Sequence, residues 1–209
     1  MSVVVITPPE ALLTPEEAQM MAPVMADDGY VRVRELLAAA QAAIEPVSWP
    51  GAAFGRQTLE WRLSGFPCAS ERLPFGPASS IVSVKYDDAD GDERTVDAAD
   101  YRLIDGGSLR ARIELRRNCS WPATDCGANA VRIRYVTGSE RTDPRLSAAK
   151  QAIVLSATAL RSLSSADLAL RSVEVVGVST RTYVVSDAAS KIVQSAVDRL
   201  LAPYWVPSV

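Results

Sequence analysis

Val131-Arg132-Ile133-Arg134-Tyr135-Val136-Thr137 is the stretch of sequence that decides the fold of this chain. Up to Tyr135 its apolar side chains alternate with arginines, the pattern of a β-strand that buries one face and leaves the other in water. The same alternation recurs at 59–63, 82–86 and 109–115. Together these stretches predict an antiparallel sheet with one solvated face.

Turn signals separate the predicted strands. Asp90-Gly91 and Gly106-Gly107 are dipeptides typical of tight hairpins. A further short strand is expected at 101–104, which makes five or six strands that close a small sandwich or barrel. The acidic run 87–93 is interpreted as a solvated hairpin tip, because a calcium loop aligned on its glycine would begin on Tyr86, which is the wrong residue for that position.

Helical patterns precede the sheet. Thr14-Pro15-Glu16-Glu17 is a capping box with proline in the first turn, and Pro23 should end the helix that it starts. A second helix is expected after Asp27-Asp28-Gly29, because apolar residues then recur at helical spacing as far as Ile44. The chain therefore reads as helix up to about Val47.

Helical patterns also follow the sheet. Asp143-Pro144 opens an alanine-rich helix that is apolar nearly all round and is therefore expected to be the central one. Ser186-Asp187 caps a last amphipathic helix, which Pro203 ends.

The predicted fold class is α+β, a small bundle of about four helices with an inserted antiparallel β module of five or six strands. We expect residues 1–56 to supply the N-terminal helices and 57–137 the β module. Residues 138–209 supply the C-terminal helices, together with an extended arm at 171–185 and a C-terminal tail at 203–209.

Composition excludes several kinds of active site. The 209 residues contain no histidine, so Ser-His-Asp and Cys-His catalysis are ruled out. The three cysteines, Cys68, Cys119 and Cys126, are interpreted as free thiols, since a zinc site lacks a fourth ligand. An enzyme built on carboxylates alone, such as Asp100 with Asp105, has no supporting spacing. We therefore expect no catalytic residue, no metal and no cofactor.

Charge and hydropathy point to a protein made in the cytoplasm. The chain has 22 Lys and Arg against 25 Asp and Glu, a net charge of −3, whereas domains that grip nucleic acid are usually basic. The apolar run at 3–6 lacks a basic flank and is too short for a signal peptide. No stretch has the apolar length of a membrane span.

Three surfaces are candidates for binding a partner. The tail either folds back onto its own core or anchors in a partner's pocket, through Pro203, Tyr204, Trp205 and Val206. The arm is either a self-paired hairpin or an extension to a neighbouring subunit, through Val173, Val175, Val178, Tyr183 and Val185. A basic stripe is either a solvated sheet face or a dock for an acidic partner or DNA phosphates, and it comprises Arg110, Arg112, Arg116, Arg132 and Arg134.

The order and spacing of these segments resemble the head–tail connector (adaptor) family of tailed bacteriophages and phage-derived gene transfer particles. Two features depart from the family pattern: Pro23 interrupts the first helix, and 171–186 has no counterpart. The resemblance covers most of the chain, and its matching stretches are 7–9, 14–18, the helix after 27–28, 56–67, 81–91, 100–103, 121–122, 131–138 and 200–204.

The resemblance implies a non-enzymatic structural protein of the virion. Such connectors form a ring, dodecameric in the family, beneath the portal protein. The ring extends the DNA channel and gives the next component, a stopper or tail protein, its attachment surface. From the mildly acidic chain we hypothesise a neutral or acidic lumen through which DNA passes without sequence-specific binding. We also predict that the tail anchors in the portal. The location would be the head–tail interface, and the host cytoplasm during assembly.

A second reading from another class stays open. The β module could be a ligand- or peptide-binding module that uses a sheet face as its groove, lined by the aromatic residues Trp61, Tyr86 and Tyr135. These three residues lie on the face assigned to the core, which favours the connector reading.

Overall fold

The structure is a computed structural model that describes residues 2–45, 51–67, 70–125, 127–162, 172–175, 179–182 and 187–205. The chain forms two compact units, and each is described by itself. The first comprises Met1–Leu12, Glu45–Leu146 and Tyr204–Val209, and we call it the β unit. The second comprises Leu13–Ile44 and Ser147–Pro203, and we call it the helical unit.

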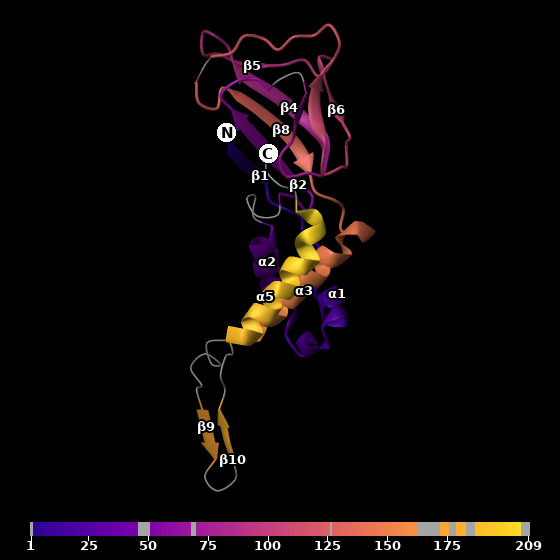
Figure 1. The fold of residues 1–209 in the computed structure, drawn as a ribbon, viewed down its shortest axis with the longest axis vertical. Helices are drawn as coiled ribbons and strands as arrows, with labels where there is room; N and C mark the ends of the chain where they lie inside the picture. The colour runs from indigo at the N-terminus through magenta and orange to yellow at the C-terminus, as the bar shows by residue number, and fades with distance from the viewer. Residues whose placement is uncertain are drawn as a thin grey trace. The chain divides into compact units, whose positions relative to one another are not determined.

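The larger sheet of the β unit has five antiparallel strands in the order β1-β2-β8-β4-β5 (Figure 1). The stretch quoted at the outset is its central strand, with Val131, Ile133 and Tyr135 fully buried. The strands are β1 (Ser2–Thr7), β2 (Gln57–Leu63), β8 (Val131–Thr137), β4 (Ala78–Asp87) and β5 (Glu93–Thr95).

A second antiparallel sheet has three strands, β3 (Ser70–Arg72), β7 (Arg112–Leu115) and β6 (Tyr101–Ile104), in the order β3-β7-β6. The strand expected at 101–104 is confirmed, whereas the one expected from 109 begins only at 112. Both sheets contribute to one core, in which Trp61 and Tyr135 from the larger sheet are buried with Ile113 from the smaller.

One strand was not expected from the sequence. The reading of the chain as helix up to Val47 is wrong at its start, because β1 pairs antiparallel with β2, with Val3 opposite Trp61. The run at 3–6 is entirely β-branched, and such residues favour a pleated strand over a helix. This strand covers an edge of β2 that would otherwise leave its backbone groups unpaired.

Among its described residues, the helical unit has four α-helices, α1 (Pro15–Met21), α2 (Tyr30–Ile44), α3 (Ser147–Ser162) and α5 (Asp187–Leu201). The capping box at Thr14 is present, and Pro23 begins a separate 3-10 turn, η1 (Pro23–Met25). These helices and the two antiparallel sheets confirm the predicted α+β class.

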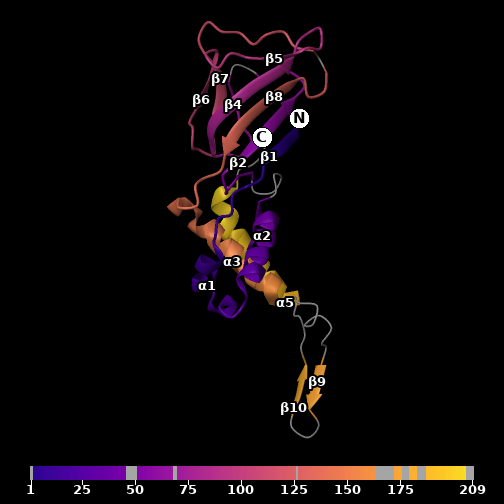
Figure 2. The same cartoon turned by 180° about the vertical axis from the view of Figure 1, so that it is seen from behind.

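Helix α3 is the central helix of its unit, as predicted. It packs against both α2 and α5 (Figures 1 and 2). Its alanines Ala149, Ala152 and Ala157 are completely buried, and these small side chains let the neighbouring helices approach closely.

The arm region contains two short strands, β9 (Ser172–Val175) and β10 (Ser179–Thr182). They pair antiparallel with each other, with Val175 opposite Ser179. Self-pairing is thus present, and an additional role at a subunit interface remains a proposal. Of the arm residues singled out in the sequence, Val178, Tyr183 and Val185 lie outside the described residues.

Candidate interaction surfaces

The tail residue Tyr204 folds back onto the β unit. It lies in a 3-10 turn, η3 (Ala202–Tyr204), and its ring meets that of buried Phe54 edge-on, with centroids 5.0 Å apart. Its hydroxyl also donates a hydrogen bond to the backbone carbonyl of Arg145. Trp205 is 73% exposed, and Val206 lies outside the described residues. Folding back onto its own core is therefore present for Tyr204, and the anchor in a partner's pocket stays a prediction.

Phe54 belongs to a segment held rigidly by one carboxylate. Oε1 of Glu45 accepts hydrogen bonds from the backbone amides of Phe54 and Gly55, at 2.7 and 2.8 Å, and from the side chain of Gln57 at 2.9 Å. The carbonyl of Phe54 accepts from the amide of Ser139 at 2.8 Å. No periodicity in the sequence singles out Phe54, because its role depends on contacts between distant segments.

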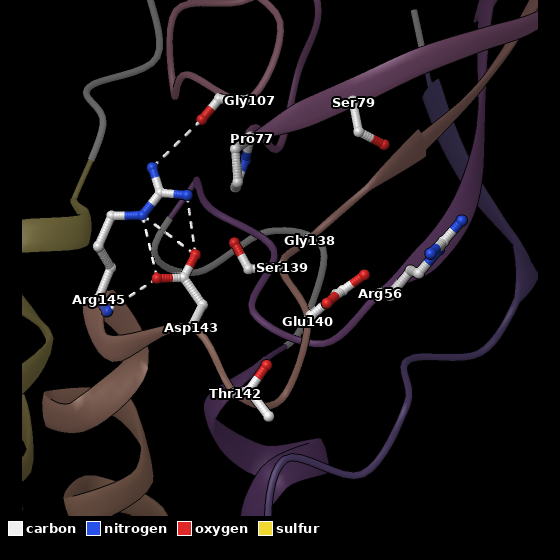
Figure 3. A pocket seen from close by; sticks show the side chains of 10 residues that line it. All are labelled: Arg56, Pro77, Ser79, Gly107, Gly138, Ser139, Glu140, Thr142, Asp143 and Arg145. Carbon is white, nitrogen blue, oxygen red and sulfur yellow. Dashed lines mark hydrogen bonds and ion pairs between the residues drawn. The ribbon is translucent and has the colours of Figure 1, made fainter.

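A cavity of about 400 Å³ lies in the β unit beside the start of β4 (Figure 3). Asp143 and Arg145 are its principal charged pair. The guanidinium of Arg145 donates to both carboxylate oxygens of Asp143, and its Nη2 lies 2.8 Å from Oδ2. These hydrogen bonds, together with one from the Arg145 amide, lower the pKa of Asp143 to about 2. The ion pair, together with the proline and glycines around it, forms a structural corner, and a hydrogen bond from Ser139 also lowers the pKa of Asp143.

A second cavity, of about 370 Å³, is lined by apolar groups of the same unit, including Phe54, Leu109, Leu146 and Tyr204. Arg110 and Arg145 are its charged lining residues. It contains no carboxylate and no cysteine among the described residues that line it. Carboxylates line the first cavity, which has Glu140 and Asp143, and Arg145 pairs with the latter.

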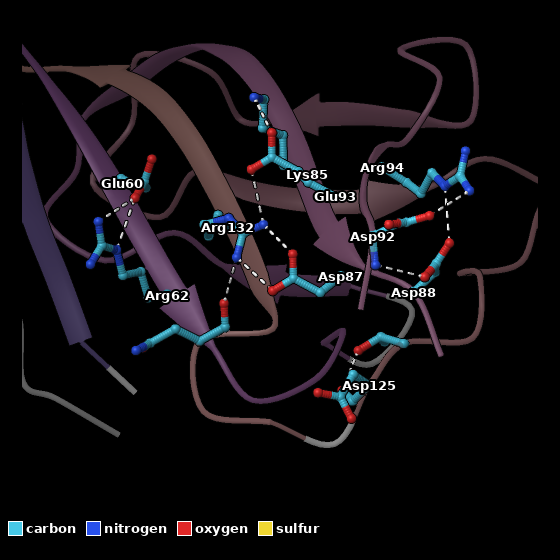
Figure 4. A network of polar contacts seen from close by, with 12 residues as sticks. Glu60, Arg62, Lys85, Asp87, Asp88, Asp92, Glu93, Arg94, Asp125 and Arg132 are labelled. Atoms are coloured by element: carbon cyan, nitrogen blue, oxygen red, sulfur yellow. Dashed lines mark hydrogen bonds and ion pairs between the residues drawn. The ribbon is translucent and has the colours of Figure 1, made fainter. Parts of the chain in front are cut away.

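The sheet carries a network of ion pairs on its polar side chains (Figure 4). Arg132 binds Asp87 at two points, 2.5 and 2.8 Å, and also reaches Glu93 at 3.1 Å. Lys85 donates to Glu93 at 2.6 Å. Hydrogen bonds from Arg132 lower the pKa of Asp87, and those from Lys85 lower the pKa of Glu93. Both carboxylates therefore stay ionised and neutralise the cations.

Glu60 neutralises two further arginines of the larger sheet. Its side chain is 6% exposed and accepts from Arg62 and Arg134, each at 2.8 Å. Burial by itself raises the pKa of Glu60, but the hydrogen bonds from Arg134 and Arg62 outweigh burial and lower it. The sequence pattern singled out the arginines of this face, but it did not identify Glu60 as the buried acid that pairs with them.

The predicted basic stripe is not a single unpaired surface. Arg132 and Arg134 lie on β8 of the larger sheet, whereas Arg112 lies on β7 of the smaller one. Arg112 lies 3.8 Å from Asp105, and Arg116 donates to the carbonyl of Tyr101. Arg110 precedes β7 and lines the second cavity. The alternation predicted correctly that these residues face away from the core, but it does not specify which acids pair with them.

The acidic run 87–93 forms the β4–β5 hairpin tip that the sequence predicts. The carboxylate of Asp88 accepts hydrogen bonds from the backbone amides of Asp90 and Asp92 and from the side chain of Arg94. It therefore stabilises the turn. In the described part of the chain, no three acidic or cysteine side chains are grouped to hold a metal ion. Cys119 is a free thiol, and Cys68 and Cys126 lie outside the described residues.

The aromatic residues proposed to line a ligand groove do not do so. Trp61 and Tyr135 are 2% and 0% exposed, and Tyr86 packs against the same core. The hydroxyl of Tyr135 donates to the carbonyl of Pro74 at 2.6 Å, and burial raises its pKa. The hypothesis of a ligand groove lined by these three aromatic residues is therefore not supported. Among the described helices, none combines the length and the apolar character required to span a bilayer.

Comparison with solved structures finds the same fold in gene transfer agent (GTA) particles. A chain from the neck of an empty GTA particle computed with C6 symmetry has a TM-score of 0.64 and 22% sequence identity. A chain from the virion of a native GTA particle has a TM-score of 0.64 and 21% sequence identity. A chain from the neck of a native GTA particle computed with C12 symmetry has a TM-score of 0.60 and 20% sequence identity. Each comparison covers 100% of this chain and 97% of the other.

At these identities the likeness establishes the fold, and it confirms the fold expected from the family resemblance. No model of a known protein family matches the sequence, and no curated protein matches it.

Proposed function

We propose that this protein is a head–tail connector, a structural component of the neck of a phage-like particle. It forms a ring beneath the portal, extends the DNA channel and provides the attachment surface for the next tail component. Its place is the head–tail interface of the virion, and the host cytoplasm while particles assemble. It performs no catalysis and needs no cofactor.

The observation that carries this proposal is the length of the structural likeness. The similarity runs over 100% of this chain and 97% of chains in GTA particles, so both units and their connectivity are matched together. A shared small module would match only one unit. Two of the similar chains come from necks computed with C6 and C12 symmetry, which supports a ring with twelve subunits as the family resemblance implies.

The charges of the larger sheet support passage of DNA without binding. Arg132, Arg134 and Arg62 are held by Asp87, Glu93 and Glu60, so their charges are matched within the subunit. Unpaired cations would bind phosphates and slow a moving duplex. The net charge of −3 agrees with a neutral or acidic lumen.

The tail supplies the proposed contact with the portal. Tyr204 packs on Phe54, whereas the side chain of Trp205 is exposed. Trp205 is therefore the tail residue that we expect to enter a partner's pocket. Aromatic side chains of this kind are common binding hot spots. Pro203, Tyr204 and Val206 then position or flank the anchor, and the arm with β9 and β10 would contact a neighbouring subunit.

The experiment that tests the function removes the protein from particles. Deleting its coding gene in the strain that produces the particles should give DNA-filled or emptied heads without attached tails, counted by electron microscopy. A copy supplied in trans should restore complete particles. Normal tailed particles that retain their genome in the absence of the protein would rule the proposal out.

A further inference from the structure

The connection between α1 and α2 exposes a concentration of apolar side chains. Met20 is 76% exposed and Val31 is 61% exposed. Singly scattered exposed apolar residues are ordinary on a protein surface, whereas a large contiguous apolar patch marks an interaction site. We call this group the connection face, and it comprises Met20, Met21, Val24, Tyr30 and Val31.

The backbone under the connection face is held in place. The side-chain amide of Gln19 on α1 donates hydrogen bonds to the backbone carbonyls of Met25 and Asp28, at 3.2 and 3.1 Å. These hydrogen bonds link the connection to α1. The carboxylate of Asp28 pairs with Arg161 of α3 and lies 3.8 Å from Arg32 of α2. Met25 is completely buried. The apolar side chains are therefore presented on a preformed surface, which reduces the entropy lost on binding.

The connection face is bordered by negative charge. Glu16 lies one helical turn before Met20 on α1, and Asp27 lies within the connection. Both are exposed, and neither forms an ion pair with any residue that the structure describes.

Helix α5 carries a surface of the opposite charge. A shallow groove runs along it, with Ile192 on its wall at 69% exposure. Lys191 and Arg199 line the groove and have no ion pair among the described residues, and no acid lines it with them. Asp198 accepts a hydrogen bond from Gln194 outside the groove. We call this surface the α5 face, and it comprises Lys191, Ile192, Ser195, Ala196, Arg199 and Leu200.

The two faces belong to helices on opposite sides of α3. In Figure 1, α5 lies in front of α3, whereas Figure 2 shows α1 and α2 in front with α5 behind. A cyclic ring is built by two different patches on each subunit, each mating with the other patch on the next subunit. Two complementary patches carried by helices on opposite sides of α3 satisfy this requirement.

We propose that the connection face of one copy docks on the α5 face of the next copy. The occupant of the α5 face is thus a second copy of this chain, with Met20 and Val24 against Ile192 and with Glu16 and Asp27 near Lys191 and Arg199. The apolar contact supplies affinity, while the opposite charges select the head-to-tail pairing and disfavour like faces. This pairing rests on the proposed ring, in which the connection face and the α5 face form the contact between neighbouring subunits.

Photocrosslinking of the full chain tests this pairing. A benzophenone side chain is placed at Ile192, and a matched control carries it at Gln194, which is exposed on α5 outside the groove. Each is mixed with wild-type chain labelled with ¹⁵N, so that crosslinks between copies are separated from those within a copy by mass. The variant at Ile192 should crosslink to residues 20–31 of the labelled copy at least about tenfold more than the control does.

A charge exchange tests the same contact independently. Reversal of one face, E16K with D27K, or of the other, K191E with R199E, should lower the crosslink yield about tenfold when paired with wild-type chain. Pairing the two reversed faces with each other should restore the yield.

Two results would overturn the assignment: crosslinks from Ile192 that fall on α5 of the other copy or on the β unit, or equal yields from Ile192 and Gln194. Neither result depends on particle assembly. Gene deletion that leaves particles normal would instead remove the connector function, and crosslinks at 20–31 would then show self-association alone.

Discussion

Tyr204 stands edge-on to Phe54 at a centroid separation of 5.0 Å, and its hydroxyl hydrogen-bonds the carbonyl of Arg145. A residue expected to bind a partner thus also stabilises its own subunit. Tyr204→Phe keeps the ring contact and removes the hydrogen bond, so it should lower the free energy of unfolding by about 1 kcal/mol. Tyr204→Ala removes both and should lower it by about 2–3 kcal/mol. Urea unfolding measures both values, and equal stability of all three proteins would contradict the packing role.

Trp205 should affect docking and not stability. Because its side chain is 73% exposed, Trp205→Ala should change the free energy of unfolding by less than about 0.5 kcal/mol. If it anchors in the portal, the same change should weaken binding to portal rings by at least about tenfold. Tyr204→Phe is the matched control, since it disturbs the tail without removing the exposed anchor. Truncation from Tyr204 onward would confound docking with lost packing. Unchanged portal binding by Trp205→Ala would exclude the anchor.

Asp143 should contribute to the loss of stability in acid. Its pKa in the folded protein is about 2, held down by Arg145, and is near 3.9 in an unfolded chain. A carboxyl whose pKa is depressed by folding stabilises the protein above the unfolded value, and its contribution is lost as the pH falls from about 4 to 2. Asp143→Asn should therefore give a shallower fall of the urea midpoint over that range.

The partner variant Arg145→Ala checks the cause of this pH dependence. It removes the guanidinium that lowers the pKa, so it should flatten the same part of the curve. A wild-type acid slope in both variants would show that the ion pair has no role in it.

Glu60 should be a costly residue to neutralise. Its buried carboxylate joins Arg62 and Arg134, and Glu60→Gln leaves two cations without their counter-ion. Removing one partner from a buried pair costs about 3–5 kcal/mol, and the partial exposure of both arginines should reduce this to roughly 2–3 kcal/mol. Glu71→Gln is the matched control, because Glu71 is exposed on β3 and forms no ion pair with a described residue. Equal effects of the two changes in urea unfolding would contradict the assignment.

Gly138 should tolerate no side chain. Its φ is +84°, and a Cβ there would lie 2.1 Å from the carbonyl oxygen of Gly55. Gly91 has the same φ, but a Cβ at that position meets no atom within 4 Å. Gly91→Ala should therefore cost about 1–2 kcal/mol for the left-handed backbone alone, and Gly138→Ala at least about 3 kcal/mol. Similar urea midpoints for the two variants would show that the backbone moves apart at Gly138.

Local sequence patterns predicted most of the elements. Thr14 and Pro23 bound the first helix, and the alternation around Ile133 marks the central strand, because both signals depend only on neighbours along the chain. The strand at Ser2–Thr7 was missed, since a short β-branched run becomes a strand only when an open edge such as that of β2 is available to it.

The candidate surfaces were predicted less well. The sequence predicted the same role for Tyr204 and Trp205. The structure distinguishes them, because Tyr204 packs on Phe54 and Trp205 is exposed. It also marked the sheet arginines, whereas their pairing depends on strand register, which places Arg134 directly opposite Glu60. The exposed side chains of the connection face were not anticipated, because a helical apolar pattern does not show where a neighbouring helix is missing.

The sequence by itself determined the α+β class, the four helices, the central strands and the absence of histidine chemistry, since composition and periodicity are properties of the chain alone. Tertiary structure decided which charges are neutralised, which apolar side chains remain in water and which tail residue is free. The physical reason is that burial and ion pairing are set by residues distant along the chain, whose meeting depends on register and packing.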